Sequence, residues 1–200
     1  TTHLFDEAEE AGRIGILDRG RLVALGSPAD LKREVGGDVL VLREDLLAIG
    51  YSERTEETTI ERLSEALKAA GSEVRQIIVV AIPHERSFMH LDTIFTQVSE
   101  GECLCYAPMI AAGGAEEADV YSVDLAHDEI TWTPETDFLS ALKKRGLDLE
   151  PIPCGGRDPI DEQREQWTDG ANAFAVAPGI IVCYDRNERT ADELDRHGYE

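Results

Sequence analysis

The chain has 200 residues, of which 42% are hydrophobic, so it can bury a core and is not disordered along its whole length. Its 41 acidic and 19 basic residues give a formal charge of −22, which disfavours nucleic acid and anionic membranes as partners. Because the acids are spread along the chain, we expect the acidic surface of a protein adapted to concentrated salt, where screening reduces self-repulsion. An ordinary acidic protein is the alternative.

The cysteines show neither the density nor the spacing of a disulfide framework or a zinc site. They are Cys103, Cys105, Cys154 and Cys183. We expect a reducing compartment, no metal and no cofactor. The sequence contains no apolar run near the roughly eighteen residues that span a bilayer and no visible secretion signal. We therefore expect a cytoplasmic protein without membrane insertion.

The first 35 residues predict a small unit of their own. An acidic helix is expected over 5–13, followed by a β-hairpin with strands at 14–17 and 21–25 around the turn Asp18-Arg19-Gly20. Ser27-Pro28 favours the start of a short helix that ends before Gly36-Gly37. We place a domain boundary here, with one unit over 1–35 and another over 36–200.

From residue 38 onward, strand and helix patterns alternate. Strands are expected at 39–42, 46–50, 74–82, 89–98, 121–125, 129–133, 149–153, 173–177 and 180–184, and helices at 56–70, 135–145 and from Thr190. The segment 155–166 is interpreted as a polar loop, and Pro178-Gly179 as a turn. The recurring order of strands and helix predicts an α/β fold built from repeated modules.

The most informative residues are His90 and Asp92. If residues 89–98 form an alternating strand, these two side chains lie on one face, about 7 Å apart. An imidazole beside a carboxylate can move protons and hold a cation. The alternative is a histidine and a strand-end charge with no catalytic role, because a lone pair of this kind has little specificity.

Several phrases occur in the order found in one enzyme family. They are Gly36-Gly37-Asp38-Val39-Leu40-Val41-Leu42, Ile49-Gly50-Tyr51-Ser52-Glu53-Arg54-Thr55, Met89-His90-Leu91-Asp92-Thr93-Ile94-Phe95-Thr96, Arg164-Glu165-Gln166-Trp167-Thr168-Asp169-Gly170-Ala171-Asn172, Ala177-Pro178-Gly179 and Tyr184-Asp185-Arg186-Asn187. Residues 36–200 thereby resemble the C-terminal half of an arginine deiminase, which hydrolyses the guanidinium group of arginine. The resemblance implies a partial α/β propeller of pentein-like modules, preceded here by the short N-terminal hairpin and helix segment.

The resemblance also implies roles for individual residues. Asp92 would hold two guanidinium N–H groups in a bidentate pair, and His90 would protonate the departing ammonia and then activate water. Arg54 matches the arginine that binds the substrate's α-carboxylate; a surface salt bridge to Glu53 or Glu57 is the alternative. Asp38 matches an aspartate near the site, and could instead cap a turn.

Two departures from the family pattern stand out. Val35 replaces the glutamate that precedes Gly-Gly-Asp, and Glu34 lies one position earlier, on the opposite face if the segment is a strand. The family's nucleophilic cysteine belongs to a glycine-rich motif beyond the helix at Thr190, and the sequence ends at Glu200. Cys154, although followed by two glycines, is interpreted as a structural thiol. We therefore expect no activity from this chain alone.

Residues 1–35 resemble the end of an ATP-binding-cassette ATPase instead. There His3 matches the switch histidine that touches the γ-phosphate, but the Walker A loop is absent. Three hypotheses remain: an amidine hydrolase that converts L-arginine to citrulline and ammonia, the tail of a transport ATPase, and a non-catalytic arginine-binding relative. The length of the match favours the first. The sequence leaves open a homo-oligomer.

Overall fold

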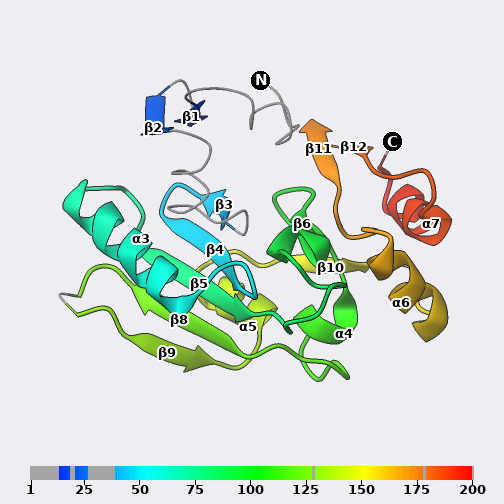
Figure 1. Cartoon of the computed structure of the whole chain (residues 1–200). Coiled ribbons are helices and arrows are strands. Elements are labelled where there is room, and N and C mark those ends of the chain that lie inside the picture. Colours follow the sequence, from blue (N-terminus) through cyan, green and yellow to red (C-terminus); the bar gives the residue numbers. More distant parts are fainter. Residues whose placement is uncertain (1–13, 19–20, 27–38, 128, 178, 200) are drawn as a thin grey trace.

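A computed structural model describes residues 14–18, 21–26, 39–127, 129–177 and 179–199 (Figure 1). The fold is mixed α/β, which confirms the expected class. It has a five-stranded sheet, a three-stranded sheet and two two-stranded hairpins. Within those ranges the strands do not close into a barrel or propeller. The helices expected at 5–13 and 28–33 fall outside the described residues.

The first sheet unit begins with a hairpin and continues through a helix. Strands β3 (Val39–Arg43) and β4 (Leu46–Tyr51) are antiparallel, α3 (Glu57–Ala69) crosses over, and β5 (Gln76–Ala81) returns parallel to β4. Both β4 and β5 are continuous apolar runs and are buried along nearly their whole length. This confirms the prediction that the latter run is buried on both faces.

A second hairpin extends that sheet. Strands β8 (Val120–Asp124) and β9 (Trp132–Glu135) are antiparallel, and β8 pairs with β5, so the order is β3-β4-β5-β8-β9. The hairpin was expected, but its second strand begins at Trp132 and the predicted strand at 129–133 is therefore displaced. Helix α5 (Phe138–Lys144) follows, where Asp137 accepts a hydrogen bond from the Ser140 N–H and caps the first turn.

The three-stranded sheet repeats the connection of the first unit. Strands β6 (Phe95–Gln97) and β7 (Glu102–Cys105) are antiparallel, and β10 (Glu150–Pro153) is parallel to β7. Between β7 and β10 the chain forms α4 (Ala107–Ile110), β8, β9 and α5. Both units thus have an antiparallel pair followed by a crossover to a parallel third strand. The recurrence expected from the sequence was misplaced: its second repeat began at the hairpin over 121–133, which instead extends the first sheet, and β7 was not among the expected strands.

Three clusters of buried side chains form the core. One lies beneath α3 and includes Ile60, Ile77 and Val79. The second contains side chains of both sheets and of α4 and α5, among them Ile78 and Phe95. The third packs β7 and β10 against the C-terminal part of the chain. Because the second cluster draws on both sheets, the two units share one interior.

The strand expected over 89–98 is wrong for most of its length. Residues Leu91–Thr93 form the 3-10 helix η1, and only Phe95–Gln97 form a strand. Phe88, Leu91 and Ile94 are buried, and their spacing of three fits a 3-10 turn rather than a strand of period two. His90 and Asp92 therefore do not lie on one face of a strand, contrary to the expectation.

The polar loop expected over 155–166 is also wrong, because α6 (Pro159–Trp167) occupies it. Asp158 caps this helix by accepting hydrogen bonds from the next N–H groups, and Pro159 stands at its first position. Strands β11 (Phe174–Ala177) and β12 (Ile180–Val182) confirm the hairpin expected around Pro178-Gly179.

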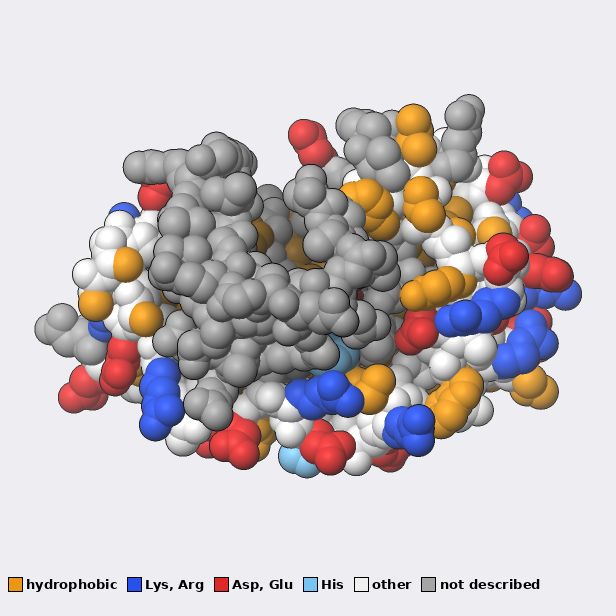
Figure 2. All heavy atoms as spheres, turned by 45° about the horizontal axis from the view of Figure 1, so that its top comes forward, with side chains coloured by type: hydrophobic (Ala, Val, Ile, Leu, Met, Phe, Trp, Pro, Cys, Tyr) orange, Lys and Arg blue, Asp and Glu red, His pale blue; other side chains and the backbone are white. Residues whose placement is uncertain are grey.

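The last helix is α7 (Glu188–Arg196), which begins slightly before the expected start at Thr190. Near the other end of the chain, β1 (Ile14–Asp18) and β2 (Arg21–Gly26) confirm the expected N-terminal hairpin. No helix in the described ranges is long and apolar enough to cross a membrane. On the face shown in Figure 2, both acidic and basic side chains occur around the periphery.

Candidate functional site

One edge of the five-stranded sheet brings the candidate residues together. Because β4 and β5 are parallel, the segments that follow them emerge at the same edge. The Ile82 N–H donates to the Tyr51 carbonyl oxygen at 2.8 Å, which continues the pairing beyond the strands. The turn 52–55 and the loop 82–90 therefore lie side by side, although more than a full helix separates them in sequence.

Arg54 lies in the first of these segments. Ser52 and Thr55 exchange backbone hydrogen bonds of 3.2 and 3.3 Å, which close the turn that presents the exposed Arg54. Its Nη2 donates to the Met89 Sδ at 3.4 Å, next to His90 in the chain. In the described part of the chain Arg54 forms no ion pair with Glu53 or Glu57, so the surface salt bridge considered from sequence is not formed there. The guanidinium group points toward the segment of the candidate acid and base.

His90 is the residue at the start of η1. Its backbone is extended (φ −144°, ψ 156°), and its carbonyl oxygen accepts hydrogen bonds from the Thr93 N–H at 3.1 Å and the Thr93 Oγ1 at 2.6 Å. His90 and Asp92 are both half-buried and alternate in sequence with the buried Leu91 and Thr93. The two residues thus belong to one tight turn and not to one face of the expected strand.

The remaining predicted residues fall outside the description. Asp38, Glu34, Val35 and His3 are not among the described residues. Val39, the first residue of β3, pairs with Ile49 near the end of β4, and β3 packs against η1. The amino end of β3 therefore reaches the same sheet edge as the turn 52–55 and the loop 82–90.

The cysteines are poorly suited to act as nucleophiles: three are buried, and burial raises the thiol pKa of the half-buried Cys183. Cys154 is fully buried after β10, and burial raises the pKa of its thiol to about 12. The hydrogen bond with Cys103, together with complete burial, raises the pKa of Cys105 well above its ordinary value. Since a nucleophilic cysteine needs an accessible thiolate, Cys154 behaves as the structural thiol that the sequence indicated.

Two of the sequence phrases, 164–172 and 184–187, contact each other near α6 and α7. The buried Glu165 carboxylate accepts hydrogen bonds from the Arg189 N–H at 2.9 Å and from the Thr190 N–H and Oγ1 at 2.8 Å each. Asn187, also fully buried, donates from Nδ2 to the Thr168 carbonyl oxygen at 3.0 Å. Because a carboxylate at a helix N-terminus satisfies free N–H groups, Glu165 fixes α7 onto α6.

Comparison with known proteins matches residues 28–200 to the family model described as "ADI: Arginine deiminase". The chain belongs to the arginine deiminase family. The match begins upstream of the expected junction at residue 35. An arginine deiminase of Listeria welshimeri is 42% identical over 165 residues, which are 82% of this chain and 40% of the relative's length. One of Latilactobacillus sakei is 39% identical over 171 residues, 84% of this chain and 41% of the relative.

The chain thus spans about two fifths of the length of these arginine deiminases. Two solved amidinotransferases also resemble the fold over 82% of this chain. One, from Microseira wollei in saxitoxin biosynthesis, has 17% sequence identity, is covered over 37% of its own chain and gives a TM-score of 0.49. The other, the inosamine-phosphate amidinotransferase of Streptomyces griseus, has 16% identity, is covered over 38% of its chain and gives a TM-score of 0.46. Both TM-scores are too low to carry an argument. Family membership rests on the sequence matches.

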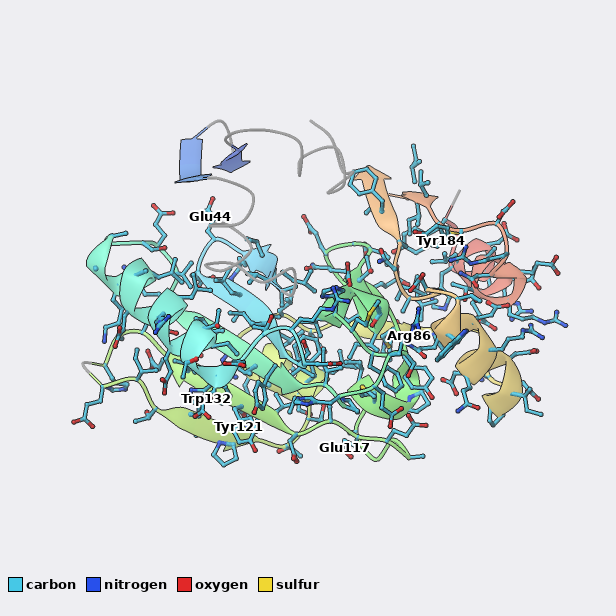
Figure 3. The ribbon with its side chains drawn as sticks, in the orientation of Figure 1. Glu44, Arg86, Glu117, Tyr121, Trp132 and Tyr184 are labelled. Atoms are coloured by element: carbon cyan, nitrogen blue, oxygen red, sulfur yellow. The ribbon has the colours of Figure 1, made fainter. Side chains whose placement is uncertain are left out.

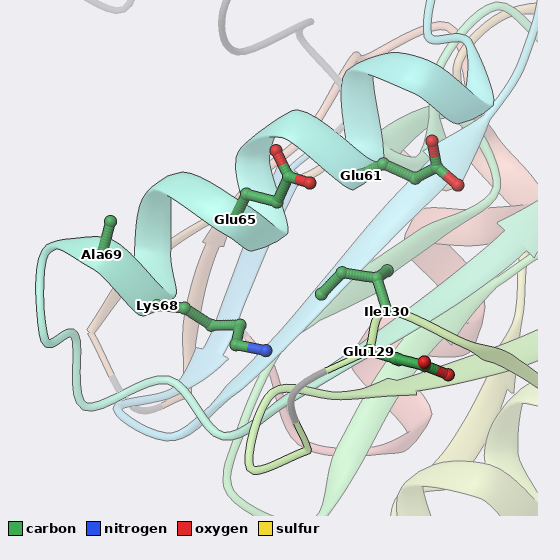
Figure 4. Close-up of a pocket in the computed structure, with 6 residues that line it drawn as sticks. All are labelled: Glu61, Glu65, Lys68, Ala69, Glu129 and Ile130. Atoms are coloured by element: carbon green, nitrogen blue, oxygen red, sulfur yellow. The ribbon is translucent and has the colours of Figure 1, made fainter.

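A pocket of about 790 Å³ lies elsewhere, between α3 and the segment before β9 (Figure 4). Its lining residues are Glu61, Glu65, Lys68, Ala69, Glu129 and Ile130. Among the described candidate residues, Arg54, His90 and Asp92 do not line it. The described residues also contain no group of three or more histidine, cysteine or acidic side chains placed to hold a metal ion.

Proposed function

We propose that this chain carries part of an arginine deiminase site, which converts L-arginine and water to citrulline and ammonia. The observation that carries the proposal is the meeting of Arg54 with the segment of His90 and Asp92 at one sheet edge, through the 3.4 Å contact of Arg54 Nη2 with Met89 Sδ. An arginine side chain, a carboxylate and an imidazole are the groups needed to bind an amino acid at one end and its guanidinium at the other.

Each group has a distinct task in the proposal. Asp92 pairs with two guanidinium N–H groups, and Arg54 pairs with the substrate's α-carboxylate. His90 donates a proton to the departing ammonia and later takes one from water. Asp38 matches an aspartate near the site in the family pattern, in keeping with the start of β3 at this sheet edge.

The reaction requires a nucleophile in addition. A thiolate would attack the guanidinium carbon, ammonia would leave with a proton from the histidine, and water would then displace the sulfur to give citrulline. The buried Cys103, Cys105 and Cys154 do not suit this role. We infer that the family's cysteine would have to come from sequence beyond these residues, and that the present chain alone does not turn over arginine.

The repeated three-stranded units support a further part of the proposal. The finer fold, a partial propeller of pentein-like modules, is consistent with two units of identical connection. The ATPase-like origin of residues 1–35, with His3 as a remnant of a nucleotide site, stays a prediction. A non-catalytic arginine-binding relative is distinguished from an incomplete enzyme by the experiment below.

Binding and turnover are tested separately on the 200-residue chain. We expect L-arginine to bind without release of citrulline, and Asp92→Ala to weaken binding roughly 10- to 100-fold, because a charge-assisted pair contributes about 1.5–3 kcal/mol. Arg54→Ala should weaken the binding of L-arginine by a similar factor. It should leave the binding of agmatine, which lacks the carboxylate, unchanged. Calorimetry in low and in molar potassium chloride measures both, and also shows whether salt adaptation affects the site.

The control is Arg62→Ala, which removes an exposed arginine on α3, away from the candidate site. It should bind L-arginine as the unaltered chain does. Citrulline released by the unaltered chain, and still released after all four cysteines are replaced by serine, would contradict the proposed thiolate mechanism. Supplying the family's cysteine motif together with the glutamate at position 35 and the family's upstream guanidinium-binding aspartate should restore turnover, whereas a non-catalytic relative would still only bind.

A further inference from the structure

The loop 82–90, which leads into His90, is held on more than one side. Phe88 is buried and its ring lies 5.8 Å from that of Tyr106, and the Phe88 N–H donates to the Glu85 carbonyl oxygen at 3.0 Å. Met89 contacts Arg54. Ser87, which precedes Phe88, has a carbonyl oxygen that accepts a further hydrogen bond from outside the loop.

Gln166 supplies the donor from the other end of the sequence. Its side chain, only 2% exposed on α6, donates from Nε2 to the Ser87 carbonyl oxygen at 2.6 Å. In Figure 3, Arg86 marks the turn next to this helix. The bond of this buried amide with the carbonyl of the half-buried Ser87 is costly to lose, because removing one partner leaves the other without that hydrogen bond. The contact joins residues 79 positions apart.

Helix α6 is itself firmly placed, so it can act as a support. Asp158 caps its N-terminus, and Glu165, the neighbour of Gln166, fastens it to α7. At its start the backbone runs against Gly155, where an added Cβ would lie 2.5 Å from the Asp161 carbonyl oxygen and the Glu162 Cα. A side chain at Gly155 would therefore displace the helix. Gln166 extends from a rigid element into a loop that has no regular structure of its own.

We propose that Gln166 is a positioning residue for the site: through Ser87 it fixes the loop that sets the place of His90 and Asp92. The inference rests on the proposed function for its meaning, but the contact itself is tested without substrate. It couples the α6–α7 region, whose buried polar residues form the network around Glu165, to the sheet edge that carries the candidate acid and base.

The test compares Gln166→Met with Gln163→Met in the 200-residue chain. Methionine keeps the length of glutamine but cannot donate a hydrogen bond, and Gln163 is exposed on the same helix. For Gln166→Met we expect hydrogen exchange at the Phe88 and Thr93 amides, both hydrogen-bonded within this segment, to speed up roughly 5- to 10-fold, the factor that corresponds to about one hydrogen bond. The amides of β5 and the thermal midpoint should change little. Gln163→Met should alter none of these.

A conservative variant gives a second arm. Gln166→Glu has the same shape but donates only when its carboxyl is protonated, so protection of the loop should be lost at neutral pH and return, relative to the unaltered chain, as the pH falls. The titration midpoint of the His90 imidazole, followed by NMR, should differ from that of the unaltered chain in Gln166→Met. A change confined to general stability would leave this midpoint where it was.

Two results would overturn the inference. One is unchanged exchange at Phe88 and Thr93 together with an unchanged His90 titration in Gln166→Met. The other is equal acceleration at every amide, in β5 as much as in the loop, which would show a general loss of stability. If the exchange and titration results hold but the unaltered chain does not bind L-arginine, the positioning contact stands and the proposed function is wrong. The two failures are thus distinguishable.

Discussion

The two three-stranded units have the same connection but differ in what lies between their second and third strands. In the first unit α3 alone leads from β4 to β5, and it covers the sheet that it connects. In the second unit the segment between β7 and β10 carries α4, α5 and the hairpin β8–β9, which pairs with β5 of the first unit. The first unit is completed locally, whereas the second is completed through its neighbour. Neither can unfold without exposing the core cluster that they share.

The largest effect should come from the core cluster that the two units share. Phe95, at the start of β6, is fully buried and its ring meets that of Phe138 on α5 edge-to-face at 4.9 Å. Phe95→Ala removes this ring from the shared cluster and leaves a cavity, so we expect a loss of about 3–5 kcal/mol in the free energy of unfolding. Urea denaturation followed by circular dichroism measures it.

The control is Trp167→Ala, which removes a ring that is 62% exposed at the end of α6. It should change the free energy of unfolding by about 0.5 kcal/mol or less, as surface substitutions usually do. If Phe95→Ala produced two separate unfolding transitions, the units would be independent and the comparison above would be wrong. A single transition at lower denaturant supports a shared interior.

The next effect concerns the polar clamp, the group of hydrogen-bonded side chains where β5, β9 and α5 meet, which consists of Gln76, Glu135, Lys144 and Arg145. Glu135 is only 6% exposed at its side chain and accepts from Arg145 Nη2 at 2.8 Å and Lys144 Nζ at 2.5 Å, while Arg145 Nε also donates to Gln76. Burial opposes the charged form, but the hydrogen bonds from Lys144 and Arg145 outweigh it and lower the pKa of Glu135. Glu135→Gln should therefore cost about 2–3 kcal/mol near neutral pH.

The pH dependence has a definite sign. Because the folded pKa of Glu135 lies below the value of about 4.3 expected in the unfolded chain, its contribution is complete above that value and is lost as the pH falls through the folded pKa. The deficit of Glu135→Gln should shrink in acid. Asp148→Asn, which breaks a well-exposed pair with Lys143 of similar length, should cost about 0.5 kcal/mol or less at any pH. Equal costs for the two variants would refute the clamp.

Much of the fold was readable from local patterns. The apolar runs of β4 and β5, the helical spacing of α3 and the turn residues Pro178-Gly179 predicted elements that the structure confirms. Helix α6 was missed because the face it buries is polar: Glu165 and Gln166 are its buried residues, so no apolar period marks it. Asp158-Pro159 carried the missing signal, a cap followed by proline at the first helical position.

The candidate site was predictable only as a set of residue types. The phrases identified His90, Asp92 and Arg54, but the geometry assigned to the first two was wrong, since the spacing of Phe88, Leu91 and Ile94 by three was interpreted as part of a strand. The contacts that organise the site join distant positions, Arg54 with Met89 and Gln166 with Ser87. Such pairings depend on the sheet order, which short-range patterns do not contain.

The smallest effect tests how the second unit holds the C-terminal end of the chain. Glu102 on β7 accepts hydrogen bonds from the Tyr199 hydroxyl at 2.7 Å and bonds His197 Nδ1 at 2.8 Å, and these contacts, the tyrosine first, lower the pKa of Glu102. Tyr199→Phe should cost about 1 kcal/mol near neutral pH, and less as the pH falls through the folded pKa of Glu102, because a protonated carboxyl is a weaker acceptor.

A double-mutant cycle isolates the contact from the burial of the tyrosine ring, which is 7% exposed. In the background of Glu102→Gln, the change Tyr199→Phe should cost distinctly less than in the unaltered chain, since the anionic acceptor is already gone. Additive costs would mean that the ring alone fastens the C-terminal end. Coupling of about 0.5–1.5 kcal/mol would show that a charged hydrogen bond joins β7 to Tyr199, which follows α7. The second unit, which is completed through its neighbour on one side, would then be fastened on the other side by this bond.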